Sequence, residues 1–319
     1  MGRCDLGPDL ISYLVPGSWV SGESIASSLG VSRAAVSKRI RYLRMKGYII
    51  ESSTKKGYRL SENLDLLDPE IISKSLDSRL IGRELRYFRE VGSTNQTADE
   101  IAASCRDGTV VLAEMQTNGK GRLSRSWLSP PGGIYMSLIL KPEIPLANVY
   151  RINMAVSLAI TKAFFSLYGL QTRIKWPNDI LIHERKICGI LMEINAEVDR
   201  LKYAIVGIGI NANIDAKSLP SDWNATSLST ELGHAVSRIE LIQRLLHDIE
   251  EAYLHLGSRD IYLQWRERSA TLGRNVRVTS MDGNLEGKAV DLSEDGTLKI
   301  MVPEGIKQVL AGDCIHLRA

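Results

Sequence analysis

The sequence has few cysteines and no long apolar run, and both absences limit what the protein can be. Its four cysteines, Cys4, Cys105, Cys188 and Cys314, are scattered, with neither the paired spacing of a zinc site nor the density of a disulfide framework. No apolar signal-like core follows the start, and no apolar run reaches bilayer length. We therefore expect reduced thiols in a cytoplasmic protein that neither crosses a membrane nor is secreted.

The chain also has little net charge, but its charge is unevenly distributed. The formal net charge is +3 over 319 residues. From Arg33 to Arg59 there are nine cations and one acid, Glu51, so the rest of the chain carries about five net negative charges. An excess of cations confined to one segment predicts that any polyanion partner binds there.

This basic segment has the pattern of a helix-turn-helix. "GESIASSLGVSRAAVSKRIRYLRMKGYII" reads as two helices joined by a turn at Gly30, which suits a left-handed position, with Ser32 as the N-cap of the second helix. Val36, Ile40 and Leu43 recur at i, i+4 and i+7 and predict one buried stripe. The following "YIIESSTKKGYRL" predicts a two-stranded wing with a basic tip.

The opposite side of the second helix, together with the wing, is suited to DNA. Small and polar residues there can approach base edges while cations meet phosphates. The alternative is a small helical bundle with a solvated charged face. The stripe, the turn, the cations and the hairpin all agree, which favours DNA binding. The predicted DNA-binding residues are Ser32, Arg33, Ala34, Ser37, Lys38, Arg41, Lys55 and Lys56.

The rest of the chain predicts two further domains. Asp68 before Pro69 resembles an N-cap followed by proline at the first helical position, so a new element starts there. Strand-like and helix-like runs then alternate, which is typical of a mixed sheet with helices. The last segment has short β-rich runs separated by Asp-Gly turns. We expect domains at residues 1–65, 66–270 and 271–319, the last a small barrel.

A basic loop, "TNGKGRLSRSW", lies between the strand-like runs "VVLAEM" and "IYMSLIL". No acidic residue occurs between Glu114 and Glu143, so its cations have no partner nearby in the sequence. Gly119 and Gly121 would allow positive φ and expose backbone N-H groups, which together with the cations describes a small anion site. A flexible, solvated hairpin is the alternative. The loop lacks the GxxxxGK[ST] pattern of a P-loop.

A second cluster, "IKWPNDILI", places Lys175 at a corner fixed by Trp176-Pro177. The corner is compatible with a simple hairpin around a packed tryptophan. However, an unpaired ammonium that enters from an apolar strand is costly to bury. A bound carboxylate or phosphate would remove that cost.

These motifs, taken in order, resemble those of biotin protein ligases. The matching stretches are "GSTN" (92–95), "QTNGKGR" (116–122), "SW" (126–127), "KWPND" (175–179), "KICGILME" (186–193) and "GIGIN" (207–211). With the helix-turn-helix, the chain resembles the bifunctional ligase and biotin operon repressor. The resemblance implies an α+β protein: a winged helix-turn-helix, a central mixed α/β domain with a class II synthetase-like sheet, and an SH3-like C-terminal barrel.

The resemblance also implies site residues. Those implied to bind biotin are Ser93, Thr94, Asn95, Gln116, Lys120, Gly121, Arg122, Lys175, Gly189 and Leu191. Those implied to bind ATP are Gly119, Lys120, Arg122, Arg125, Trp127, Asn178, Asn211 and Arg318, and Trp223 is added to this set from its own sequence context. Catalysis would depend on Lys175, Arg122 and Arg125, with Mg²⁺ on the phosphates and no fixed protein ligand for it. From its own context, Trp223 either stacks on adenine or anchors its loop.

The implied reaction has two steps: biotin and ATP form biotinyl-5′-adenylate, and a lysine of a biotin carboxyl carrier protein then takes the biotinyl group. The adenylate-bound protein would dimerise on operator DNA, with "YAIVGIGIN" or a neighbouring strand at the interface. Two alternatives are a biotin-sensing repressor with weak or no ligase activity and a lipoate ligase-like enzyme, although the Arg-Arg-x-Ser-Gly-Gly-Gly loop of lipoate ligases is absent.

Four positions depart from the family pattern. Lys120 stands where arginine is common, and lysine lacks its bidentate geometry. Leu123-Ser124 replaces further Arg and Gly, which bears on how tightly the loop retains the adenylate. Ser37 stands where tryptophan is frequent, so the operator sequence does not carry over.

Overall fold

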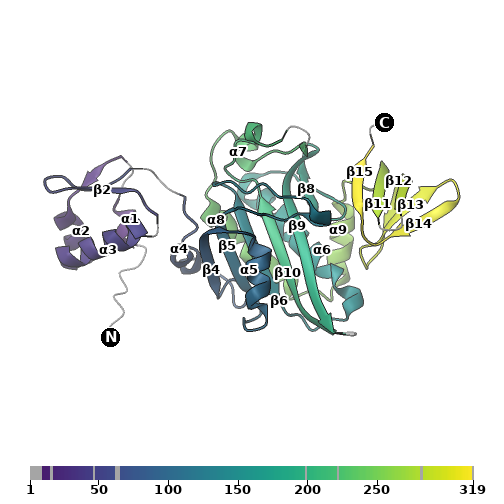
Figure 1. Cartoon of the computed structure of the whole chain (residues 1–319), viewed down its shortest axis with the longest axis horizontal. Coiled ribbons are helices and arrows are strands. Elements are labelled where there is room, and N and C mark those ends of the chain that lie inside the picture. Colours follow the sequence, from purple (N-terminus) through teal and green to yellow (C-terminus); the bar gives the residue numbers. More distant parts are fainter. Residues whose placement is uncertain are drawn as a thin grey trace. The chain divides into compact units, whose positions relative to one another are not determined.

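A computed structural model describes residues 9–14, 17–45, 47–61, 65–197, 200–220, 223–280 and 283–317 (Figure 1). The chain divides into two compact units, Met1–Lys74 and Ser75–Ala319. The domain limits that we expected after residues 65 and 270 remain predictions.

The smaller unit contains a three-stranded sheet and short helices. In the sheet, β1 (Trp19–Val20) and β2 (Ile50–Ser53) both pair with β3 (Gly57–Leu60), in the order β1-β3-β2. The helices are α1 (Asp9–Ser12), α2 (Gly22–Leu29), α3 (Arg33–Met45) and α4 (Pro69–Lys74). The β2–β3 hairpin follows α3 directly, as the wing of a winged helix-turn-helix does.

Local sequence signals determine where these helices begin and end. Gly30 is left-handed at φ +63° and ends α2. The Ser32 hydroxyl accepts a hydrogen bond from the Ala35 N–H at 3.2 Å, so Ser32 caps α3 as predicted. Asp68 accepts from the Glu70 N–H at 3.0 Å at the start of α4. The predicted stripe of α3 is buried in the core of this unit: Val36, Ile40 and Leu43.

The larger unit is built on a seven-stranded sheet with the order β4-β5-β6-β10-β9-β8-β7. β4 (Leu85–Val91) and β5 (Thr109–Gln116) are parallel, and the other neighbouring pairs are antiparallel. The remaining strands are β6 (Ile134–Leu140), β7 (Arg173–Lys175), β8 (Asp179–Ile182), β9 (Arg185–Glu197) and β10 (Arg200–Ile210).

Helices cover both faces of this sheet. On one face, α5 (Thr94–Ala102) packs over Val111, Ile139 and Ile205. The other face is also buried, and α6 (Tyr150–Tyr168) and α8 (Arg238–Tyr253) pack together there (Figure 1). α6 matches the predicted helix and ends at the left-handed Gly169, φ +67°. The shorter helices are α7 (Leu228–Leu232) and α9 (Arg259–Glu267).

The last strands of the chain form a five-stranded antiparallel sheet with the order β14-β13-β12-β11-β15. They are β11 (Asn275–Ser280), β12 (Gly283–Leu292), β13 (Leu298–Val302), β14 (Gly305–Val309) and β15 (Asp313–His316). The predicted fold class, with a winged N-terminal domain, a mixed central domain and a small C-terminal barrel, is confirmed. This barrel is tied to the main sheet, because the Trp176 indole donates to the Gly296 carbonyl at 2.9 Å.

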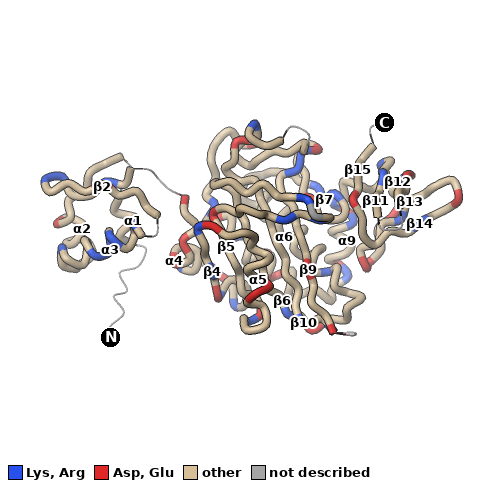
Figure 2. The backbone as a smooth tube through the Cα atoms, viewed as in Figure 1, with Lys and Arg blue, Asp and Glu red and all other residues tan. Residues whose placement is uncertain are grey.

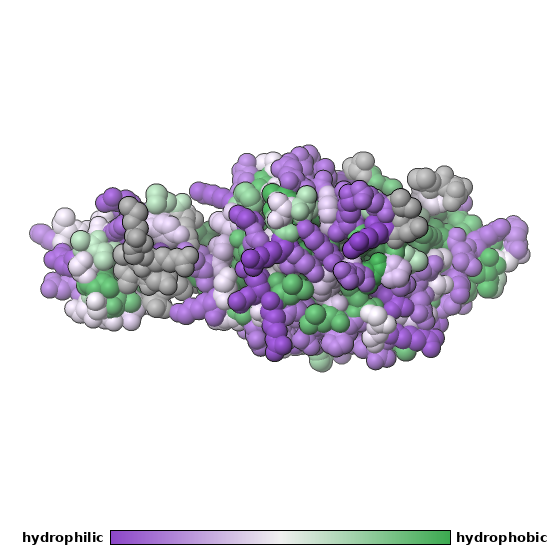
Figure 3. Space-filling model, turned by 90° about the horizontal axis from the view of Figure 1, so that it is seen from below, coloured by the Kyte–Doolittle hydropathy of each residue, from purple (hydrophilic) through white to green (hydrophobic). Residues whose placement is uncertain are grey.

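On the face in Figure 3, hydrophobic residues form small separate groups among hydrophilic ones. Among the described helices, none combines the length and the apolar character needed to cross a membrane.

Candidate functional site

A cavity of about 800 Å³ lies between the main sheet, the basic loop and the C-terminal barrel. β9 and β10 supply its floor, the start of α5 one corner, and Gly312–Ile315 of the barrel a wall. The cavity brings together segments that are far apart in the sequence. All ten residues predicted for biotin line it: Ser93, Thr94, Asn95, Gln116, Lys120, Gly121, Arg122, Lys175, Gly189 and Leu191.

The corner at the start of α5 is a closed polar network. The Gln116 carboxamide oxygen accepts from the Thr94 N–H at 2.8 Å and from its hydroxyl at 3.1 Å, while the Gln116 amide donates to Ser129 at 2.8 Å. Asn95 accepts from Ser137 at 2.7 Å and donates to a Glu193 carboxylate oxygen at 2.6 Å. Because these bonds fix each side chain, the corner has a rigid shape before any ligand arrives.

The basic loop is a tight hairpin, and the expected roles of its glycines are wrong. Neither Gly119 nor Gly121 has a positive φ; the left-handed residue in this loop is Leu123, at φ +52°. Gly119 is required by close approach, because a Cβ there would overlap the carbonyl oxygen of Trp127. The Gly121 N–H is used inside the loop, donating to the Arg125 carbonyl at 2.7 Å. An anion here would therefore be held mainly by side-chain cations.

Those cations differ in their partners. Arg125 makes a two-pronged ion pair with Asp313 of the barrel, at 2.9 and 2.6 Å, although no acid lies near it in the sequence. Within the described part of the chain, Lys120, Arg122 and Lys175 have no ion pair. Burial lowers the pKa of Arg122 from its ordinary value, since desolvation disfavours the charged form. Arg122 and Lys175 are thus cations that line the cavity without a carboxylate partner among the described residues.

Lys186 is a further cation in the cavity, and it was not predicted. Its Nζ lies 2.7 Å from Asp179 Oδ1 and 5.1 Å from the ring centre of Trp127. It enters from an apolar run, "KICGIL", as Lys175 enters from "RIKWP". The argument that an ammonium on an apolar strand is costly to bury would have identified both lysines.

The floor of the cavity is a stripe of glycines on neighbouring strands. Gly209 of β10 pairs with Gly189 of β9, and the Trp127 indole lies across both. A Cβ would stand 2.5 Å from the indole at Gly209 and 2.8 Å at Gly189, and at Gly207 it would overlap the side chain of Asn95. The Trp127 Nε1–H is buried and has no acceptor in the described structure, so it is available to a ligand.

The residues predicted for the nucleotide are less uniformly placed. Lys120, Arg122, Arg125, Trp127, Asn178, Asn211 and Trp223 line the cavity, whereas Gly119 does not and Arg318 lies outside the described residues. Asn178 donates to the Ile190 carbonyl at 2.6 Å and Asn211 to the Thr226 carbonyl at 2.9 Å. Both amides therefore also hold the chain, while Trp223 is 38% exposed at the rim.

The thiols near the site are poor nucleophiles. Burial raises the pKa of Cys188, and it raises the pKa of Cys314 to about 12. Cys105, Cys188 and Cys314 are free, and Cys4 lies outside the described residues. No group of three His, Cys, Asp or Glu side chains in the described ranges is placed to hold a metal ion. Among the described residues the cavity thus gathers cations that can neutralise an anion, and the two thiols near it are not activated.

The predicted DNA-binding residues lie at the start of α3, along α3 and at the β2–β3 turn of the N-terminal unit. All eight are exposed: Ser32, Arg33, Ala34, Ser37, Lys38, Arg41, Lys55 and Lys56. Figure 2 shows Lys and Arg at the tip of the hairpin that β2 begins. Arg39 instead pairs with Glu70 of α4 at 2.9 Å, so it stabilises the unit rather than joining this exposed set.

Comparisons with known proteins match three separate stretches of the chain. Family models match as follows: HTH domain, residues 13–59; Biotin/lipoate A/B protein ligase family, residues 87–211; Biotin protein ligase C terminal domain, residues 271–317. Bifunctional ligase/repressor BirA is 39% identical in Bacillus spizizenii and 38% in Bacillus subtilis, each over 320 residues and 98% of both chains. The structure of biotin protein ligase from Aquifex aeolicus in complex with biotin and ATP is 31% identical, with a TM-score of 0.64, over 74% of this chain and 100% of that one.

Proposed function

Because the chain belongs to the family of bifunctional biotin ligase/repressors, we infer that it activates biotin with ATP, transfers the biotinyl group to a lysine of an acceptor protein, and represses transcription. The observation that supports the ligase most directly is the cavity, where unpaired cations face a rigid polar corner. Its volume, about 800 Å³, lies within the usual range for small-molecule sites.

In the first step, an oxygen of the biotin carboxylate attacks the α-phosphorus of ATP, and the bond to the β-phosphate oxygen breaks. The products are biotinyl-5′-adenylate and pyrophosphate. The carboxylate is already nucleophilic at pH 7, so the site needs no general base. It needs to bring two anions together, and Lys175 and Arg122 can supply the neutralising charge. Lys186 adds a third cation, partly offset by Asp179.

Biotin would lie toward the polar corner and the nucleotide toward Trp127 and Trp223. The free Trp127 N–H and the exposed Trp223 indole suit a polar aromatic ligand such as adenine. Arg125 is anchored to Asp313, so its role is to hold the loop to the barrel as well as to face phosphate. Mg²⁺ would enter on the ATP phosphates, since the described carboxylates do not form a cluster for it.

In the second step, the neutral amine of the acceptor lysine attacks the acyl carbon of the mixed anhydride, and AMP leaves. Water would hydrolyse the same bond, so the basic loop would have to exclude water from the cavity to protect the intermediate. The acceptor would be a biotin carboxyl carrier protein, and both partners would meet in the cytoplasm.

The repressor function assigns operator DNA to the exposed face of α3 and the wing. A two-fold operator needs a dimer, which we propose forms with adenylate bound. β10, which contains "YAIVGIGIN", pairs along its length with β6 and β9, so its backbone edges are already used. The neighbouring β9 extends past its β8 pairing, and no described strand pairs with that side of it from Met192 to Glu197, so we propose this edge for a second copy.

One experiment tests the central proposal. The purified protein is incubated with biotin and ATP, and the bound product is identified by mass spectrometry. Biotinyl-5′-adenylate is the expected product. If only unreacted biotin is bound, the alternative function as a biotin-sensing repressor without ligase activity is favoured. If lipoyl-adenylate forms when lipoate competes with biotin, a lipoate ligase is favoured. In an electrophoretic mobility-shift assay, retardation of operator DNA only when biotin and ATP are both present would support the repressor function.

A further inference from the structure

The turn between β8 and β9 contains two non-glycine residues in left-handed conformations. His183 has φ +45° and Glu184 φ +65°. Glycine or asparagine would adopt these angles with less strain. Strained residues persist where their contacts compensate for the strain. Glu184 has two polar groups that can make such contacts, its carboxylate and its backbone carbonyl.

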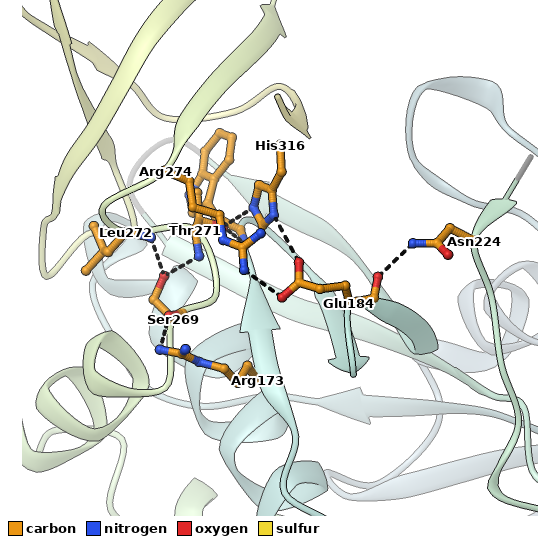
Figure 4. Close-up of polar contacts among 9 residues, drawn as sticks. Arg173, Glu184, Asn224, Ser269, Thr271, Leu272, Arg274 and His316 are labelled. Carbon is orange, nitrogen blue, oxygen red and sulfur yellow. Dashed lines mark hydrogen bonds and ion pairs between the residues drawn. The ribbon is translucent and has the colours of Figure 1, made fainter. Parts of the chain in front are cut away.

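The Glu184 carboxylate faces the C-terminal barrel (Figure 4). One oxygen lies 2.6 Å from Arg274 Nη2 and the other 4.0 Å from His316 Nδ1. Burial, with the charges of Lys175 and Arg274, lowers the pKa of His316 to about 4, so the imidazole is neutral at pH 7. Its Nε2 is 3.0 Å from the Thr271 hydroxyl. If that hydroxyl donates, the imidazole proton sits on Nδ1 and faces Glu184.

The same contacts continue to the catalytic corner. The Thr271 hydroxyl accepts from the backbone N–H of Trp176 at 3.0 Å. Trp176 directly follows Lys175, the cation at the centre of the proposed chemistry. His316, at the end of β15, is therefore connected through Thr271 to the strand that carries Lys175, while Glu184 holds Arg274, which directly precedes β11, the strand paired with β15.

The Glu184 carbonyl faces the opposite wall of the cavity. It accepts from Asn224 Nδ2 at 2.9 Å, as Figure 4 shows, and Asn224 directly follows Trp223. Two backbone bonds extend the attachment: Lys186 N–H to the Asn224 carbonyl at 2.8 Å, and Thr226 N–H to the Lys186 carbonyl at 2.9 Å. The segment that carries Trp223 thus lies along the first residues of β9.

One residue therefore joins two walls of the cavity. Gly312–Ile315 form the barrel wall, and Asp313 within it also holds Arg125 of the basic loop. We infer that Glu184 is a positioning residue for the nucleotide half of the site: its carboxylate holds Arg274 just before β11, the strand paired with β15, and its carbonyl holds the segment bearing Trp223. This inference rests on the proposed function, because it takes ATP as the ligand between these walls.

The test compares Glu184→Asn with His183→Asn in the full-length protein. Both substitutions relax a left-handed position in the same turn, but only the first removes the contacts to the barrel. Initial rates of pyrophosphate release give KM for ATP, KM for biotin and kcat, and thermal unfolding gives Tm. The Glu184–Arg274 pair is about half exposed, at 51% and 39%, so its loss is modest. We expect Glu184→Asn to raise KM for ATP about fivefold, which is about 1 kcal/mol, with KM for biotin unchanged.

Two further arms separate the possible failures. Arg274→Ala should raise KM for ATP to a similar extent, and the double variant should add little, since both remove one interaction. Trp223→Ala tests the nucleotide assignment itself. If Trp223→Ala raises KM for ATP while Glu184→Asn behaves like His183→Asn, the positioning role is wrong and the proposed function stands. If Trp223→Ala leaves KM for ATP unchanged, the nucleotide assignment of that wall is wrong and the positioning role fails with it. A fall in Tm with KM for both substrates raised equally would assign Glu184 a purely structural role and overturn the inference.

Discussion

Replacing Lys175 by methionine should separate catalysis from stability. Lys175 lines the cavity, is half-buried, and has no ion pair within the described structure. Such an ammonium disfavours folding, because it loses hydration without gaining a partner. Methionine keeps most of the volume and removes the charge. The protein should therefore lose activity without losing stability.

The expected effect on the activation free energy is larger than the expected effect on the free energy of unfolding. Removing one group that stabilises developing charge costs about 2.7–4 kcal/mol, a loss of about 10²- to 10³-fold in rate. Relieving the desolvation of one half-buried ammonium stabilises the fold by at most about 1 kcal/mol, or about 2–4 °C in Tm for a domain of this size. We expect Lys175→Met to have an unchanged or slightly raised Tm.

Lys186→Met is the matched control. Its ammonium already pairs with Asp179 at 2.7 Å, with side-chain exposures of 29% and 20%. Removing it leaves a partly buried carboxylate without a cation, which costs about 1–2 kcal/mol, between exposed and fully buried pairs. Both variants should release pyrophosphate slowly from biotin and ATP, but only Lys186→Met should unfold at a lower temperature. If Lys175→Met releases pyrophosphate at a rate within about threefold of the unmodified protein, the expected loss of about 2.7–4 kcal/mol is absent and the role of Lys175 is refuted.

Three other changes give equally definite expectations. Gly209→Ala places a Cβ 2.5 Å from the Trp127 indole and should displace it, raising KM for ATP at least about tenfold; steady-state kinetics and tryptophan fluorescence check this. Lys38→Ala should weaken operator binding and reduce the slope of log K against log salt by about 1, with pyrophosphate release unchanged, so an unchanged slope would remove Lys38 from the DNA surface. Burial alone would raise the pKa of Glu250, but hydrogen bonds from the backbone N–H groups of residues 79–81 lower this pKa overall. The ionised Glu250 therefore stabilises the folded protein fully above the unfolded-state pKa, about 4.3, and this contribution disappears as pH falls through the folded-state pKa. Glu250→Gln should therefore lower the free energy of unfolding in urea by about 1–2 kcal/mol at pH 7 and by progressively less as pH falls below about 4.3; a loss that does not change with pH would contradict the assignment.

Features set by neighbouring residues were predictable from the sequence. The left-handed Gly30 and Gly169, the Ser32 cap and the buried face of α3 follow from helix geometry over a few residues. The basic loop and the Lys175 corner were correctly placed between strands, because apolar runs of strand length flank them. Their meeting in one cavity was implied by family resemblance, not by spacing.

Contacts across long sequence distances were not predictable. Arg125 had no acid nearby, yet Asp313 pairs with it from 188 residues away. The expected reason for the glycines of the basic loop, a positive φ, was wrong: Gly119 is needed because a Cβ there would overlap the Trp127 carbonyl oxygen. A backbone approach between residues eight apart depends on how the hairpin closes, which local propensity does not specify.

The glycine stripe under the cavity reverses the ordinary rule for improving a sheet. Gly189, Gly207 and Gly209 lie within strands, where glycine weakens the strand by roughly 0.5–1 kcal/mol per residue relative to alanine. A search for thermostable variants would therefore favour β-branched residues at all three positions. Such side chains would displace Trp127 and Asn95, which line the cavity, so engineering for heat resistance has to leave this weak stripe as it is.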